Sequence, residues 1–168
     1  MKLKACFLVV SVLLIGIAAD SKDAKPVEGV NPGDFAPRIV VNGNESEIHF
    51  QNPDGRFTLV NFWAAYDAES RAENVLLWNA VRKLNGSTEK VSMCSISLDE
   101  RNSVFEETIR ADKLDRTTQL HEKKGCQSDV YRKYKLERGL RNFLIDDRGI
   151  IVATNISSES LAELGKRI

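Results

Sequence analysis

Two continuous apolar runs stand out in the middle of the chain, TLVNFW at 58–63 and KVSMCSISLD at 90–99. Such runs are typical of strands that are covered on both faces of a sheet. The 69–85 segment between them places its apolar side chains at helical spacing, and Asn85-Gly86 supplies a stop signal. A strand, a helix and a second strand in this order predict a parallel pair with a right-handed crossover.

The flanking segments complete the expected order of elements. Before the first run, RIVVNG and EIHFQNPDGRF alternate apolar and polar residues and predict short strands with turns at their Asn-Gly and Asp-Gly pairs. After the second run, helices are predicted at 103–114 and 128–136, with a loop between them. Residues 142–154, NFLIDDRGIIVAT, predict a hairpin, and residues 157–168 a final helix. The order β-β-β-α-β-α-α-β-β-α predicts a mixed sheet with helices on both faces.

The N-terminal part of the chain follows a different pattern. Two lysines precede an uncharged run from Ala5 to Ala19, which is the layout of a secretory signal peptide. The run is short for a membrane-spanning helix, which needs about 20 apolar residues. We therefore predict a signal peptide over 1–18, cleaved after Ala18 or Ala19, and keep a retained anchor as the alternative. The polar residues 19–30 predict a flexible leader, and 31–168 a single domain.

The charge balance argues against two classes of partner. The chain has 24 Lys and Arg residues and 24 Asp and Glu residues. Removal of Lys2 and Lys4 with the signal peptide leaves 22 basic residues against 24 acidic ones, a net charge of −2. We expect no strong attraction to nucleic acid or to an anionic membrane, and no membrane span after signal removal. The two histidines, His49 and His121, show no ligand-type spacing, so neither a metal site nor a cofactor is expected.

The predicted domain keeps two cysteines, Cys94 and Cys126, which lie far apart in the sequence. Export into an oxidising compartment would allow them to pair. They fall in an expected strand and near an expected helix start, and a disulfide requires a short separation of their Cα atoms. We favour two separate buried thiols and keep the disulfide as the alternative.

Four segments occur in a characteristic order: PGDFAP, NPDGRFTLVNFWA, ISLDE and YKLERGLRNFLIDDRGIIVA. They resemble the thioredoxin fold, and in particular the exported TlpA/ResA-like thiol–disulfide oxidoreductases of bacterial envelopes. The resemblance covers about residues 31 to 168. It implies a thioredoxin-like three-layer α/β sandwich, with a mixed central sheet and an N-terminal β-hairpin extension.

The resemblance fails at the positions that carry the family's chemistry. The family signature is a Trp, two residues, an aromatic residue, a Cys, two residues and a second Cys. Trp63 and Tyr66 match it, but Asp67 and Ser70 stand where the two cysteines are expected. Leu140 stands where the family has a cis-proline. Because a cis bond before a non-proline residue costs about 3 kcal/mol, we expect the bond before Leu140 to be trans.

These replacements predict the loss of disulfide exchange. That reaction needs an attacking thiolate and a resolving thiol, and neither Asp67 nor Ser70 supplies one. A helix N-terminus has free N–H groups and a partial positive charge, which stabilise a carboxylate. We therefore assign no catalytic residue and expect Asp67 to be an N-cap, with Ser70 hydrogen-bonded in the same turn. Two alternatives remain open: a partner-facing rim of Trp63, Tyr66, Asp67 and Ser70, with Trp63 partly exposed, and an unsuspected catalytic role.

The sequence thus favours a redox-inactive thioredoxin-like protein of the bacterial envelope, periplasmic or secreted, that binds another protein or a peptide. The alternative is a redoxin-type enzyme that uses Cys94 or Cys126 in a non-standard way. A third hypothesis is a structural part of a larger complex.

Overall fold

The computed structural model describes residues 26–41, 47–51 and 54–164. The expected signal peptide, most of the leader, the Asn42-Gly43 turn and the last four residues of the expected final helix lie outside the described residues. Residues 26–30, which our division places in the leader, contact the domain: Glu28 forms a bridge with Phe35, and Val30 is buried in the core.

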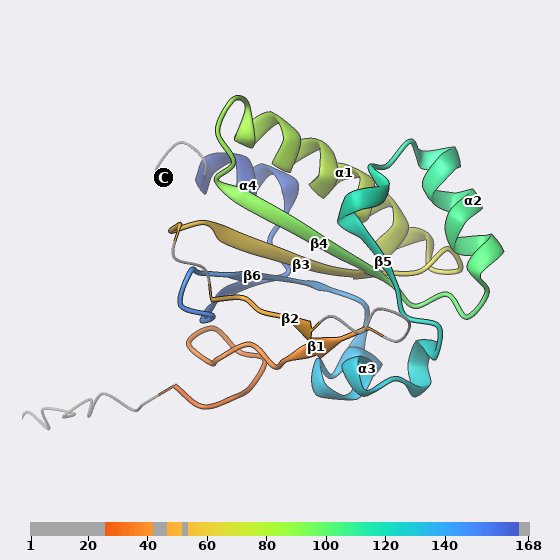
Figure 1. Ribbon diagram of the computed structural model, residues 1–168, viewed down its shortest axis with the longest axis horizontal. Coiled ribbons are helices and arrows are strands. Elements are labelled where there is room, and N and C mark those ends of the chain that lie inside the picture. Colours follow the sequence, from red (N-terminus) through yellow and green to blue (C-terminus); the bar gives the residue numbers. More distant parts are fainter. Residues whose placement is uncertain (1–25, 42–46, 52–53, 165–168) are drawn as a thin grey trace, which may run out of the picture.

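The described chain forms a central five-stranded sheet and a separate two-stranded hairpin (Figure 1). The strands are β1 (Ile39–Val40), β2 (Glu47–Ile48), β3 (Phe57–Trp63), β4 (Val91–Ser97), β5 (Gln119–His121), β6 (Asn142–Ile145) and β7 (Ile151–Thr154). The helices are α1 (Ala68–Asn85), α2 (Asn102–Asp112), α3 (Asp129–Lys133) and α4 (Ser158–Leu164), and the 3₁₀ turns are η1 (Arg116–Thr118), η2 (Gly125–Gln127) and η3 (Leu136–Arg138). These elements confirm the mixed α/β architecture with an N-terminal hairpin.

The central sheet has the strand order β5-β4-β3-β6-β7. β3, β4 and β5 are parallel, whereas β6 pairs antiparallel with β3 and β7 with β6. The expected parallel pair around α1 and the antiparallel edge hairpin are therefore both confirmed. Because β3 and β4 run in the same direction, the residues that follow Trp63 and Ser97 meet at one end of the sheet.

Apolar side chains on the two faces of the sheet form separate cores. One core packs β3, β4 and β6 against α3 and the N-terminal segment, and its largest fully buried side chains include Phe62, Tyr134 and Phe143. The other packs the opposite face against α1 and α4 through Leu77, Leu144 and other residues. Figure 1 shows α1, α2 and α4 on one side of the sheet and α3 with the hairpin on the other, so the predicted three layers are present.

The prediction was wrong between the second and third helices. Residues 119–121 form β5, whose Gln119 pairs with Ser95 of β4, instead of belonging to a loop. A strand of three residues is too short to show an alternation of apolar and polar side chains in the sequence. Its conformation is stabilised by pairing with β4. The helix expected at 128–136 is also shorter: α3 ends at Lys133, and Lys135 in the left-handed region leads into η3.

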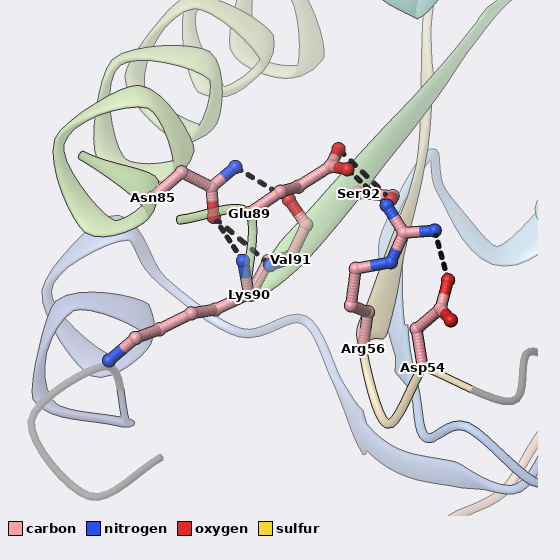
Figure 2. A network of polar contacts seen from close by, with 7 residues as sticks. All are labelled: Asp54, Arg56, Asn85, Glu89, Lys90, Val91 and Ser92. Carbon is pink, nitrogen blue, oxygen red and sulfur yellow. Dashed lines mark hydrogen bonds and ion pairs between the residues drawn. The ribbon is translucent and has the colours of Figure 1, made fainter. Parts of the chain in front are cut away.

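The end of the sheet where β3 and β4 begin is fixed by polar contacts (Figure 2). Asn85, the last residue of α1, accepts hydrogen bonds from the backbone N–H groups of Lys90 and Val91, both at 3.0 Å, and donates to the Val91 carbonyl at 2.8 Å. Arg56, just before β3, forms an ion pair with Glu89. These contacts help to fix where β4 begins beside β3. The two strands are paired in register and therefore also end together, at Trp63 and Ser97.

Candidate functional site

The candidate site begins where β3 passes into α1. Asp67 has extended backbone angles (φ −106°, ψ 99°), and its Oδ1 accepts the N–H of Ser70 at 3.1 Å, which confirms the N-cap. The Ser70 hydroxyl donates to the Asp67 carbonyl at 3.2 Å and accepts the N–H of Ala64 at 3.3 Å. The side chains of Asp67 and Ser70, which stand at the two cysteine positions, thus both form hydrogen bonds to the backbone of this turn.

Trp63 does not form part of an exposed rim. It is 0% exposed and packs against Phe105, Ile109 and Leu114, with the rings of Trp63 and Phe105 6.3 Å apart. The expectation of a partly exposed Trp63 was therefore wrong, because α2 covers this end of β3. Ser70 is also buried, at 7% exposed, so only Tyr66 and Asp67 of the expected rim reach solvent.

Tyr66 is the exposed aromatic residue of the site, with 66% of its surface accessible. Its hydroxyl lies 3.7 Å from the thiol of Cys126 in η2. Partial burial and the neighbouring thiol raise the pKa of Tyr66 above its usual value. The phenol is therefore neutral at physiological pH and can both donate and accept a hydrogen bond.

A buried carboxylate supports the turn that carries Tyr66. Asp99, 4% exposed, accepts the N–H of Ala65 at 3.1 and 2.9 Å and the Ser97 hydroxyl at 2.7 Å. His121 in β5 donates from Nε2 to the Asp99 carbonyl at 2.5 Å, and its Nδ1 lies 3.2 Å from the Oδ1 atom of Asn102. The end of β4 thus holds the 64–66 turn in place, and both ring nitrogens of His121 are occupied.

A second group of buried polar side chains joins α1 to the sheet near the site. Asn74 of α1 accepts hydrogen bonds from Asn61 of β3, at 3.0 Å, and from Ser95 of β4, and it donates to Gln119 of β5 at 3.2 Å. All four side chains are buried and hydrogen-bonded. Because unsatisfied polar groups would be costly there, this network fixes the position of α1 across three strands.

The loop before β6 completes the site. Leu140 is partly buried against the core, and the peptide bond before it is trans, as expected, since the described residues contain no cis bond. Leu140 lines a groove of about 510 Å³ together with Asp67 and Ser70. Of the five positions predicted from the sequence, Asp67, Ser70 and Leu140 line this one groove. Tyr66 lies in the turn before α1, outside the lining, and Trp63 is buried.

The two cysteines are not paired, so the disulfide alternative is wrong in this structure. Cys94 is partly buried in β4 and packs against the core, and burial raises the pKa of its thiol to about 12. Cys126, by contrast, is exposed, which corrects the expectation of two buried thiols. Cys94 is protonated at neutral pH and is a poor nucleophile, whereas Cys126 is accessible.

Neither metal binding nor a membrane span gains support from the part of the chain that the structure describes. It contains no group of three or more His, Cys, Asp or Glu side chains that could hold a metal ion. His49 is exposed just after β2, and His121 lies in β5 and is buried, which corrects the expectation of a loop position. The helices of the described ranges are also too short or too polar to cross a membrane.

The fold is shared with solved structures. A thioredoxin-like protein from Parabacteroides distasonis is 54% identical in sequence and superimposes with a TM-score of 0.78, over 84% of this chain and 99% of that one. The chain belongs to the thioredoxin-like superfamily. No family model matches it, and a comparison with curated proteins gives no match.

Thioredoxin-like structures of lower sequence identity have the same fold. The C-terminal domain of a protein described as a thiol-disulfide oxidoreductase from Bacteroides thetaiotaomicron is 25% identical, with a TM-score of 0.70 over 83% of this chain and 96% of that one. StoA from Bacillus subtilis is 21% identical, with a TM-score of 0.56 over 70% of this chain and 87% of that one, and supports the fold alone. The structural neighbours therefore confirm a thiol–disulfide oxidoreductase fold.

Sequence reasoning missed two contributors to this thioredoxin-like site. Asp99 was noted only as the end of a strand, and Cys126 only as a possible disulfide partner or separate thiol. Asp99 could have been found, because residues that follow neighbouring parallel strands meet at the same edge of a sheet. Cys126 had no such signal, since the short 3₁₀ turn that carries it has no periodic pattern.

Proposed function

We propose that this protein is a redox-inactive thioredoxin-like module of the bacterial envelope that binds another protein or a peptide through the surface around Tyr66 and Asp67. One observation carries the proposal: the side chains at the two cysteine positions are committed to the first turn of α1, with Asp67 Oδ1 3.1 Å from the Ser70 nitrogen. The helix-terminal field that would lower the pKa of a thiol stabilises a carboxylate instead.

The groups around the cap do not replace the missing thiols. A carboxylate cannot form a mixed disulfide, and a Ser hydroxyl needs an adjacent base to act as a nucleophile. Ser70 donates to a backbone carbonyl, and both nitrogens of His121 are occupied by Asp99 and Asn102. Within the described residues, the hydrogen bonds of the Ser70 hydroxyl are to backbone groups, and none is to a side-chain base.

A binding role is supported by what remains accessible. Tyr66 offers a large amphipathic side chain with few rotatable bonds, a type of residue that is enriched at the centres of interfaces. The turn that carries it is held by Asp99, so little conformational entropy is lost on binding. The groove beside Asp67 adds polar contacts.

A second candidate function rests on Cys126. This exposed thiol lies 3.7 Å from the hydroxyl of Tyr66, at the edge of the site, and could attack a disulfide in a partner. The exchange would form a mixed disulfide with Cys126 and release one partner thiol, and turnover would then require a second thiol. Cys94 lies in β4 with a raised pKa, which weakens this candidate as an enzyme.

The binding proposal is tested by photo-crosslinking in the native bacterium. The full chain would carry p-benzoylphenylalanine at Tyr66, or at the exposed Val152 of β7 as a control, and crosslinked proteins would be identified by mass spectrometry. We expect a discrete partner at position 66 that is not captured at 152. Tyr66→Ala should weaken binding of the identified partner about 30-fold, as expected for an interface hot spot of about 2 kcal/mol. Equal, background-level capture at both positions would refute the binding proposal.

A further inference from the structure

The groove beside the site has two walls of opposite charge. One wall is the start of α1, where Asp67, Glu69 and Glu73 line the groove. Glu69 and Glu73 are spaced by about one helical turn, so they share one face of the helix and repel each other. Burial, together with repulsion from Glu159 and Glu69, raises the pKa of Glu73. This wall therefore holds negative charge that a cation would stabilise.

The other wall is the loop before β6, which brings Arg138 and Arg141 to the groove on either side of Gly139 and Leu140. Arg141 donates to the Lys135 carbonyl at 2.7 Å, so part of its guanidinium is already engaged. Arg138 is exposed, and its side chain has no ion pair within the described residues. Arg138 is thus the positive group that remains available.

The two walls are not joined to each other. The ion pairs of the described residues include none between a carboxylate of α1 and an arginine of the loop. The groove between them has a volume of about 510 Å³, and Asn61, Asn142 and Ser157 add polar groups to its lining.

We propose that this groove selects a polypeptide segment carrying a Lys or Arg side chain, bound against Glu69 and Glu73, and an Asp or Glu side chain, bound against Arg138. A purely basic segment would bring a like charge to Arg138, and a purely acidic one would be repelled by the α1 wall. The inference rests on the proposed binding function and defines the class of ligand that the same site takes.

The charges are accessible at the rim of the groove, since Glu69 and Arg138 are both exposed. A chain can therefore reach them without displacement of the core. Interactions of this kind are screened by salt, with a Debye length of about 10 Å at 0.1 M and about 3 Å at 1 M. Binding through the two walls is therefore expected to weaken as the salt concentration rises.

Selection from a displayed library of random peptides tests this inference, with the full chain as bait. The wild-type protein is expected to enrich peptides in which a basic and an acidic residue lie close together. Glu69→Gln/Glu73→Gln should abolish the preference for the basic residue and keep that for the acidic one, and Arg138→Gln should do the reverse. The affinity for a selected peptide should fall about fivefold in each variant, as expected for partly exposed ion pairs.

Two exposed residues of α2 supply controls of the same charge sign, because Glu107→Gln removes a negative charge and Arg110→Gln a positive charge away from the groove. Both controls should leave the selected sequences unchanged. Enrichment of uncharged peptides, enrichment of a single charge sign, or no enrichment at all would overturn the inference. Crosslinking of a native partner at position 66 with the same yield in the wild type and in both groove variants, at a partner concentration below saturation, would overturn it as well, while leaving the binding function intact.

Discussion

A variant carrying Asp67→Cys, Ser70→Cys and Leu140→Pro is expected to reduce the disulfides of insulin. The first introduced thiol would occupy the N-terminus of α1, where the free N–H groups and the helix field lower the pKa of a thiol. The second would resolve the mixed disulfide from one turn further along. Because β3, α1 and the loop before β6 already meet at one groove, turnover should rise clearly above that of dithiothreitol alone. Insulin precipitation in the presence of dithiothreitol measures it.

The matched controls separate the roles of the three positions. Asp67→Cys alone should form a mixed disulfide without turnover, since Ser70 cannot resolve it. The double variant without Leu140→Pro shows whether the loop is needed once both thiols are present. Complete inactivity of a folded triple variant would contradict our view that the geometry of the redox site survives and that only the residues at positions 67, 70 and 140 differ from an active site.

Asp99→Ala is expected to lower the free energy of unfolding by about 2 kcal/mol, because it leaves two donors without their acceptor in a buried site. The donors are the N–H of Ala65 and the hydroxyl of Ser97. The same change should reduce crosslinking from position 66, since the turn that carries Tyr66 loses its support. Urea denaturation measures the first effect and capture of the partner the second.

Two further variants control for the charge of Asp99. Asp99→Asn keeps one acceptor oxygen and should lose less stability than Asp99→Ala. Glu100→Gln removes the next carboxylate, which is exposed, and should change stability by no more than about 0.5 kcal/mol. A loss for Asp99→Ala no larger than that for Glu100→Gln would show that the buried carboxylate does not hold the turn.

The elements that the sequence predicted best are those with long, strong patterns. β3 and β4 are continuous apolar runs, and α1 has helical periodicity and an Asn-Gly stop, so each was found within a few residues of its bounds. β5 was missed because only its three residues pair with β4. Its strand conformation depends on tertiary contact and leaves almost no local signal.

The candidate site divides in the same way between local and long-range contacts. The hydrogen bonds of Asp67 and Ser70 lie within one turn, so the spacing of these residues predicted them. The burial of Trp63 depends on α2, and the contact between Tyr66 and Cys126 joins residues 60 positions apart. No local sequence pattern determines such contacts. The exposure of Trp63 was therefore predicted wrongly, and the contact between Tyr66 and Cys126 was not predicted.

The N-cap also shows how the fold accommodates the replacement of its first signature cysteine by Asp67. A reactive thiolate at a helix N-terminus uses the local field for reactivity, whereas a capping carboxylate uses it for stability, typically by about 0.5–2 kcal/mol. Asp67 therefore stabilises α1 at the position where the resemblance implies a reactive thiol. The same scaffold can in this way carry a different function, because function depends on the site and not on the fold.

The proposed absence of redox activity is tested most directly by insulin reduction with the wild-type protein and with Cys94→Ser/Cys126→Ser. Our account predicts that both proteins reduce insulin no faster than dithiothreitol alone, since neither native thiol stands at a signature position. Reduction by the wild type that disappears in the double variant would contradict it, and would assign the activity to Cys94 or Cys126.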